Sequence, residues 1–146
     1  MKIDLYAPIQ PGISLGGISV GTPESSILKE ITNFRIDRNF EGETAYYCAD
    51  GCLVIGVNTS TGLVFRVSAM ENYRGTLLES YYLGMPISDF LKIGQDWRYS
   101  EEQAGFLHCN LKGVIICVDL EDASFEEACD DARKIGEIAI FNEDYF

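Results

Sequence analysis

Apolar and polar residues alternate along several short stretches of the chain, which is the pattern of half-buried β-strands. Turn residues separate these stretches, as at Asp50-Gly51 and at 58–62 and 110–113. Residues 53–57 and 114–118 are apolar at nearly every position, which indicates cover on both faces, or helices on one face and a partner on the other. We therefore expect strands at 34–40, 44–48, 52–57, 63–69, 96–100, 106–109, 114–118 and 137–141.

A Gly-X-Pro element occurs twice and predicts two short helices. Gly21-Thr22-Pro23 precedes a helix at 24–31, and Gly84-Met85-Pro86 precedes a helix at 87–93. We expect Thr22 to be the N-cap of the first helix. Pro23 would then occupy the first helical position, where a missing N–H is tolerated.

A third helix is predicted at 124–134, and it is strongly acidic. It begins with a capping box, in which Ser124 and Glu127 bond to each other's backbone. Apolar residues recur at helical spacing along it, and Arg133 and Lys134 fall in its last turn. We expect Gly136 to terminate this helix before the closing strand.

These elements predict an α+β fold with a largely antiparallel sheet of about eight strands and about three helices. The sequence shows no linker or low-complexity stretch, so we expect a single domain over 1–146. The repeated Gly-X-Pro element divides it into two tandem units of a helix followed by a β-meander, at 12–70 and 75–142.

Charge narrows the range of partners. The chain has 23 acidic and 11 basic residues, a net charge of −12, and the excess lies mostly in 71–146. Phosphate groups would be repelled, so we expect neither nucleic acid nor a membrane surface as partner, whereas a basic protein is compatible. The N-terminus has no long apolar stretch and no signal-like cleavage site, so we expect a cytoplasmic protein.

The cysteines do not predict a metal site. Their number, five, is odd, and only Cys48 and Cys52 have a spacing that resembles half of a zinc site. A second pair is missing and His108 is the single histidine, so we expect reduced core cysteines and no cofactor or metal.

Catalytic patterns are weak, and we expect no enzyme activity. His108 and Cys109 are neighbours, but neighbours in a strand point to opposite faces of the sheet. Residues 12–16 match the G-x-S-x-G pattern without the strand and helix that this nucleophile elbow requires. Acidic pairs such as 101–102 and 130–131 lie in polar stretches that are typical of a solvated surface.

Several segments together resemble a group of small bacterial proteins. They are Ile13-Ser14-Leu15-Gly16-Gly17-Ile18-Ser19-Val20-Gly21, Tyr73-Arg74-Gly75-Thr76-Leu77, Leu83-Gly84-Met85-Pro86-Ile87-Ser88-Asp89, Leu111-Lys112-Gly113-Val114-Ile115-Ile116-Cys117-Val118 and Ile138-Ala139-Ile140-Phe141. The chain looks like the immunity proteins encoded beside toxins of contact-dependent growth inhibition and related polymorphic toxin systems. The Gly-X-Pro-helix unit more distantly resembles the repeat of β-lactamase-inhibitory proteins.

The resemblance implies binding to a cognate toxin domain and implies no catalytic residues. Many such toxins are nucleases with a basic cleft, which an acidic inhibitor would complement. The alternative is a non-catalytic structural or regulatory binding module without a toxin partner, which could form a homodimer through an exposed sheet edge. The candidate partner-binding residues are Glu101, Glu102, Glu126, Glu127, Asp130 and Asp131, with Trp97, Tyr99, Tyr81 and Tyr82 as aromatic anchors.

Overall fold

One eight-stranded antiparallel sheet forms the framework of the protein, in a computed structural model that describes residues 2–38 and 40–144. The strands lie in the order β3-β4-β5-β6-β10-β9-β8-β7, and a small separate hairpin pairs β1 with β2. The elements of the first half are β1 (Ser14–Leu15), β2 (Ile18–Ser19), α1 (Glu24–Glu30), β3 (Arg35–Asp37), β4 (Glu43–Cys48), the 3₁₀ turn η1 (Ala49–Gly51), β5 (Leu53–Asn58) and β6 (Val64–Ala69). Those of the second half are α2 (Ile87–Ile93), β7 (Trp97–Ser100), β8 (Gly105–His108), β9 (Val114–Val118), α3 (Phe125–Ala128) and β10 (Ile135–Phe141).

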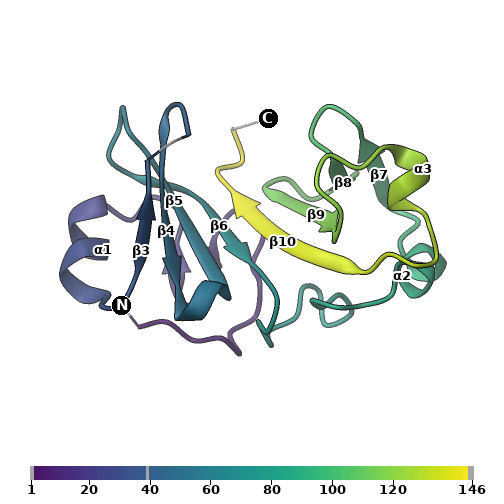
Figure 1. Ribbon diagram of the computed structural model, residues 1–146, viewed down its shortest axis with the longest axis horizontal. Coiled ribbons are helices and arrows are strands. Elements are labelled where there is room, and N and C mark those ends of the chain that lie inside the picture. The colour runs from purple at the N-terminus through teal and green to yellow at the C-terminus, as the bar shows by residue number, and fades with distance from the viewer. Residues whose placement is uncertain (1, 39, 145–146) are drawn as a thin grey trace.

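The sheet consists of two four-stranded meanders, each of which follows a short helix. The first runs from β3 to β6 after α1, and the second runs from β7 to β10 after α2. The two halves meet where β6 pairs with β10, with Ala69 opposite Ile138 and Arg66 opposite Phe141. Helices α1 and α2 lie at opposite ends of the long axis of the molecule (Figure 1). The predicted α+β class is therefore confirmed.

The main hydrophobic core lies on the face of the sheet that the helices cover. Alternate strand residues such as Ile55, Ile116 and Ile138 pack there with Ile27 of α1 and Phe90 of α2. Burial of these apolar faces stabilises the two helices, because each has only seven residues and would be marginal in isolation.

The opposite face of the sheet carries a row of uncharged side chains across the seam between the halves. Direct cross-strand partners in this row are Val54 and Ser68, then Ala139, Ile115 and Leu107. A second, smaller apolar cluster forms around Ile115 and Ala139, and its members come from β8, β9 and β10. The apolar stretches of β5 and β9 thus have side chains packed on both faces.

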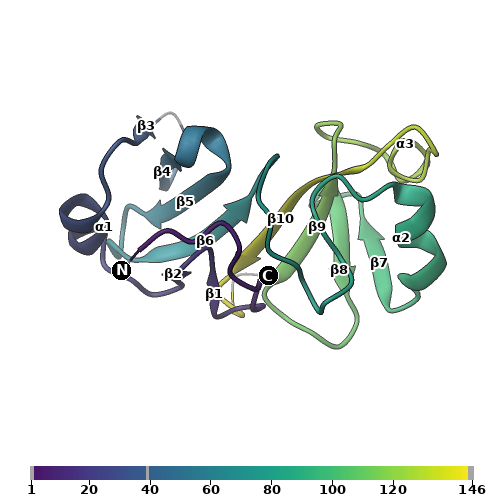
Figure 2. The same cartoon turned by 90° about the horizontal axis from the view of Figure 1, so that it is seen from below.

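The N-terminal segment runs beside β1, β2 and β6 (Figure 2). The hydroxyl group of Tyr73 accepts a hydrogen bond from the Gly16 backbone N–H at 2.9 Å and donates one to the carbonyl of Ala7 at 2.7 Å. Gly75 lies against the same segment, and a Cβ atom there would be 1.9 Å from the Ala7 oxygen. The segment is therefore held by specific polar contacts close to the sheet.

The predicted helix at 124–134 is wrong in length. The capping box of Ser124 and Glu127 forms, but α3 ends at Ala128. The chain then turns and enters β10 at Ile135, where Gly136 occupies a register shift and does not terminate a helix. A Cβ atom at Gly136 would be 2.8 Å from the Cα of Asp119, so glycine permits a close approach of two backbones.

Two smaller predictions at the start of the fold also need correction. Pro23 is the N-cap residue of α1 and has an extended backbone, whereas the Thr22 hydroxyl donates to the Ser19 carbonyl. The strand predicted at 34–40 extends only over Arg35–Asp37, and position 39 lies outside the described residues. Within the described chain, no helix is long and apolar enough to cross a membrane.

Candidate functional site

The antiparallel topology brings the most acidic loops to one end of the sheet. Successive strands reverse direction, so alternate connections of each meander share an end, and the pairing of β6 with β10 aligns the two halves. The connections at this end are residues 49–51, 70–74, 101–104 and 119–134. Together they contain eleven acidic and three basic residues, and we call them the acidic end.

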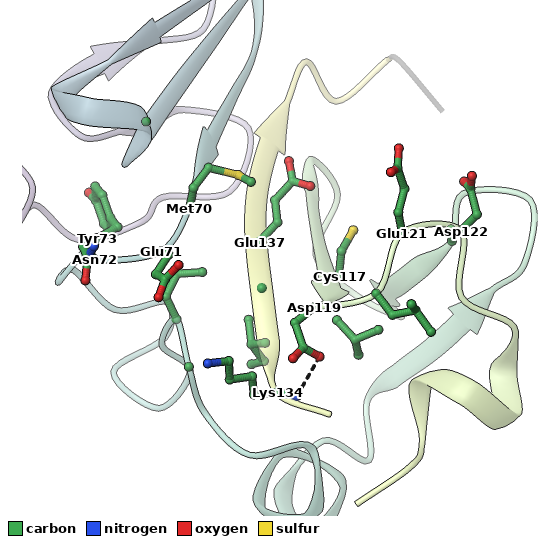
Figure 3. A pocket seen from close by; sticks show the side chains of 18 of the residues that line it. Met70, Glu71, Asn72, Tyr73, Cys117, Asp119, Glu121, Asp122, Lys134 and Glu137 are labelled. Atoms are coloured by element: carbon green, nitrogen blue, oxygen red, sulfur yellow. Dashed lines mark hydrogen bonds between the residues drawn. The ribbon is translucent and has the colours of Figure 1, made fainter. Parts of the chain in front are cut away.

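A groove of about 940 Å³ lies at the acidic end, between the two halves of the sheet. In Figure 3, Met70 and Glu71 lie on one side of it, Glu137 rises from β10, and Cys117 rises from β9. Among the described residues, six acidic and two basic side chains contribute to its lining. They are Asp50, Glu71, Asp119, Glu121, Asp122 and Glu137, with Arg74 and Lys134.

Two of these carboxylates already have partners in the protein. Asp119 accepts a hydrogen bond from the Lys134 backbone N–H at 3.1 Å and lies 3.8 Å from the Arg133 guanidinium (Figure 3 shows the first contact). Glu137 lies 3.5 Å from the guanidinium of Arg66, which also bonds Glu43. Arg66 thus connects β4, β6 and β10 across the seam between the halves.

Cys117 forms an uncharged part of the groove floor. Burial, together with the negative charge of Glu137, raises the pKa of its thiol to about 12. Its neighbour across the strands is Gly105, where a Cβ atom would come within 3.0 Å of the Cys117 sulfur. The thiol is therefore neutral and closely packed, which makes it an apolar contact surface and a poor nucleophile at neutral pH.

Each of four loops around the groove contains a non-glycine residue in the left-handed region. The φ angles are 57° at Asp50, 76° at Asn72, 53° at Ala104 and 53° at Asp122. Asn and Asp tolerate this conformation because their short side chains bond locally, whereas Ala has no such compensation. The rim of the groove is therefore built from tight turns.

The acidic residues predicted from the sequence all lie at the acidic end, in the connections 101–104 and 119–134, and none of them is among the residues that line the groove. Glu101 accepts a bond from the Phe125 N–H at 3.4 Å, which links the β7–β8 turn to α3. Hydrogen bonds from Ser124 lower the pKa of Glu127, which is fully exposed. The remaining members, Glu102, Glu126, Asp130 and Asp131, are exposed.

The predicted aromatic anchors separate into buried and accessible side chains. Trp97 and Tyr81 are 4% and 8% exposed and pack together in the core, so they offer almost no surface to a partner. Tyr99 is half-buried and donates its hydroxyl to the Ala123 carbonyl. Tyr82, at 44% exposure, is the accessible member of the set.

The groups considered above for catalysis or metal binding are His108, Cys48, Cys52 and Cys109. His108 ends β8, and its Nδ1 accepts hydrogen bonds from the N–H groups of Asn110 and Leu111, both at 3.0 Å. Cys109 lies outside the strand and is exposed. Cys48 and Cys52 are buried, and burial raises the pKa of the Cys48 thiol to about 11. Over residues 2–38 and 40–144, no group of three or more His, Cys, Asp or Glu side chains is arranged to hold a metal ion.

The sequence patterns did not identify the six groove carboxylates, because five of them come from loops of both halves and Glu137 comes from β10. The available signal was the meander itself: given the strands, alternate connections must share one end of the sheet. The pairing of β6 with β10, which brings Asp50 and Glu71 opposite the β9–β10 connection, has no local signature in the sequence.

Comparisons with known proteins identify a similar fold in an uncharacterized protein. No family model matches the sequence, and no curated protein matches it. The structure is similar to the crystal structure of the uncharacterized protein yfeY from Escherichia coli, with a TM-score of 0.61 and 14% sequence identity. The match covers 97% of this chain and 100% of that chain, so it extends over the whole fold.

Proposed function

We propose that this chain is an immunity protein that binds a cognate toxin domain, a basic nuclease, and neutralises it by protein–protein inhibition. The observation that carries the proposal is the acidic end of the sheet, where eleven of the 23 acidic residues gather. The resemblance of the glycine-rich and strand segments to immunity proteins of polymorphic toxin systems supports the same function.

The charge distribution suits a nuclease as target. A nuclease must hold phosphate groups, so its cleft is lined by Lys and Arg side chains. An acidic inhibitor surface accelerates encounter with such a cleft and fixes the orientation of the complex. Steric occlusion of the cleft then blocks access of nucleic acid, and this mechanism requires no catalytic group on the inhibitor.

The test is growth rescue by co-expression with the toxin domain encoded immediately upstream of the gene, together with a 1:1 affinity measurement on the purified pair. We expect rescue, nanomolar affinity and an association rate that falls steeply with added salt. Absence of both rescue and binding would overturn the proposal in favour of a binding module without a toxin partner.

Matched charge reversals distinguish an effect of the acidic end on association from an effect of net charge alone. The double variant Glu126→Lys with Asp130→Lys should slow association about tenfold. The control, Glu41→Lys with Asp96→Lys, changes the net charge equally at the opposite end of the sheet and should have a much smaller effect. All four side chains are exposed, so we expect each variant to fold. Equal slowing by both pairs would contradict a local role for the acidic end.

A further inference from the structure

The groove at the seam is formed jointly by the two halves of the protein. Asp50 and Glu71 come from the connections of the first meander, and Asp119, Glu121 and Asp122 come from the β9–β10 connection of the second. A partner that enters the groove therefore contacts both halves at once, unlike one that contacts α3 only.

Four of the groove carboxylates are available for cations of a partner. Within the part of the chain that the structure describes, Asp50, Glu71, Glu121 and Asp122 form no ion pair with Lys or Arg. All four are exposed, so a cationic group can reach them from solvent. A basic partner can pair with these carboxylates without displacing an existing ion pair.

The lining between the carboxylates includes apolar side chains beside the polar Asn72, Arg74, Gln103 and Lys134. Met70 and Leu83 are half-buried, and Leu120 is 37% exposed. The neutral thiol of Cys117, which is half-buried, completes this surface. Such a surface gains little from a hydrated ion but gains from contact with an apolar side chain.

The size of the groove is sufficient for a short segment of protein. A volume of about 940 Å³ exceeds what one lysine or arginine side chain would fill and lies at the upper end of the range for ligand sites. Phosphate-containing ligands would be repelled by the lining. The combination of unpaired carboxylates with the apolar side chains between them matches a peptide segment that carries both cationic and apolar side chains.

We propose that this groove receives a segment of the partner protein in which lysine or arginine side chains flank at least one apolar side chain. The cations pair with Glu71 on one wall and Glu121 on the other, and the apolar side chain lies over Cys117 and Leu120. The identification of the partner as a toxin rests on the function proposed above, whereas the chemistry of the segment follows from the groove.

The first experiment uses a defined probe, the peptide acetyl-Lys-Leu-Arg-Lys-Leu-Arg-amide, titrated into ¹⁵N-labelled protein at low salt. We expect amide shifts concentrated at residues 70–74 and 117–122, and several-fold weaker binding of the peptide with both leucines replaced by serine. Equal binding of the two peptides, or shifts spread evenly over all acidic loops, would overturn the groove as a docking site.

The second experiment uses variants to distinguish the groove proposal from the proposed immunity function. Glu71→Lys with Glu121→Lys should weaken peptide binding at least tenfold, whereas the Glu126→Lys and Asp130→Lys pair should weaken it much less. Leu120→Ser tests the apolar contact without a change of charge and should weaken binding a few-fold.

The toxin domain then gives distinct outcomes for each proposal. Loss of toxin binding in the Glu71 and Glu121 variant supports both proposals. Full toxin binding by that variant, with loss in the Glu126 and Asp130 pair, overturns the groove and leaves the immunity role intact. Peptide binding in the groove without toxin binding by the unaltered protein supports the groove and overturns the immunity role.

Discussion

Removal of one hydroxyl group tests how the N-terminal segment is held against the sheet. Tyr73 is 3% exposed, and its hydroxyl bonds Gly16 N–H at 2.9 Å and Ala7 O at 2.7 Å. The Tyr73→Phe variant preserves the ring and removes both bonds. Gly16 is buried, so its N–H loses a partner without gaining water, at a cost of about 2 kcal/mol. Ala7 is half-buried and its carbonyl can bond water instead, so loss of its hydrogen bond costs about 1 kcal/mol.

The expected loss in the free energy of unfolding is therefore about 3 kcal/mol. For a urea m-value of about 2 kcal/mol per M, the unfolding midpoint should fall by about 1.5 M, with m unchanged. Hydrogen exchange at the Gly16 amide should accelerate in native conditions, because its bond partner is removed.

Tyr82→Phe is the matched control, because its side chain is 44% exposed and the same atom is removed. It should change the free energy of unfolding by less than about 0.5 kcal/mol. If Tyr73→Phe has an effect as small as that of the control, the two hydrogen bonds do not hold the N-terminal segment and the reasoning is refuted.

Two further predictions concern the groove rim and alkaline pH. Ala104→Gly should stabilise the protein by up to about 1 kcal/mol, because Ala104 has a φ of 53° that glycine adopts without strain. A thermal melt should then show a midpoint higher by about 2–4 °C, and a lower midpoint would contradict the strain. Above pH 9 the free energy of unfolding should fall, because burial raises the pKa of Cys48 to about 11 and those of Cys117, Tyr46 and Tyr73 to about 12. The unfolded chain releases these protons first, so it is favoured as pH rises from about 9 to about 12. Urea titrations at several pH values measure this loss of stability. The Cys117→Ala variant should lose less stability over the same pH range. A free energy of unfolding that does not change with pH in the unaltered protein would disprove the prediction.

Local sequence patterns predicted most of the secondary structure. The strand at 114–118 and the helix at 87–93 have the predicted bounds. Alternation and turn residues identify such elements because they depend on neighbours within a few positions. The capping box of Ser124 was also identified correctly, but helical spacing beyond it did not produce a helix. There, the pairing of β10 with β9 as far as Ile135 and the close contact of Gly136 with Asp119 outweigh helix propensity.

The sequence by itself determined the α+β class, the two helix-plus-meander halves and the acidic excess of the second half. Only the tertiary structure decided which acidic residues share a surface, because that depends on the antiparallel pairing of β6 with β10. This pairing joins residues about seventy positions apart, and it places Asp50 and Glu71 across a groove from Glu121 and Asp122. The tertiary structure also decided that Trp97 lies in the core, where Tyr81 and Phe90 pack around it. Such contacts follow from the burial of apolar faces over the whole sheet, which no short stretch of sequence specifies.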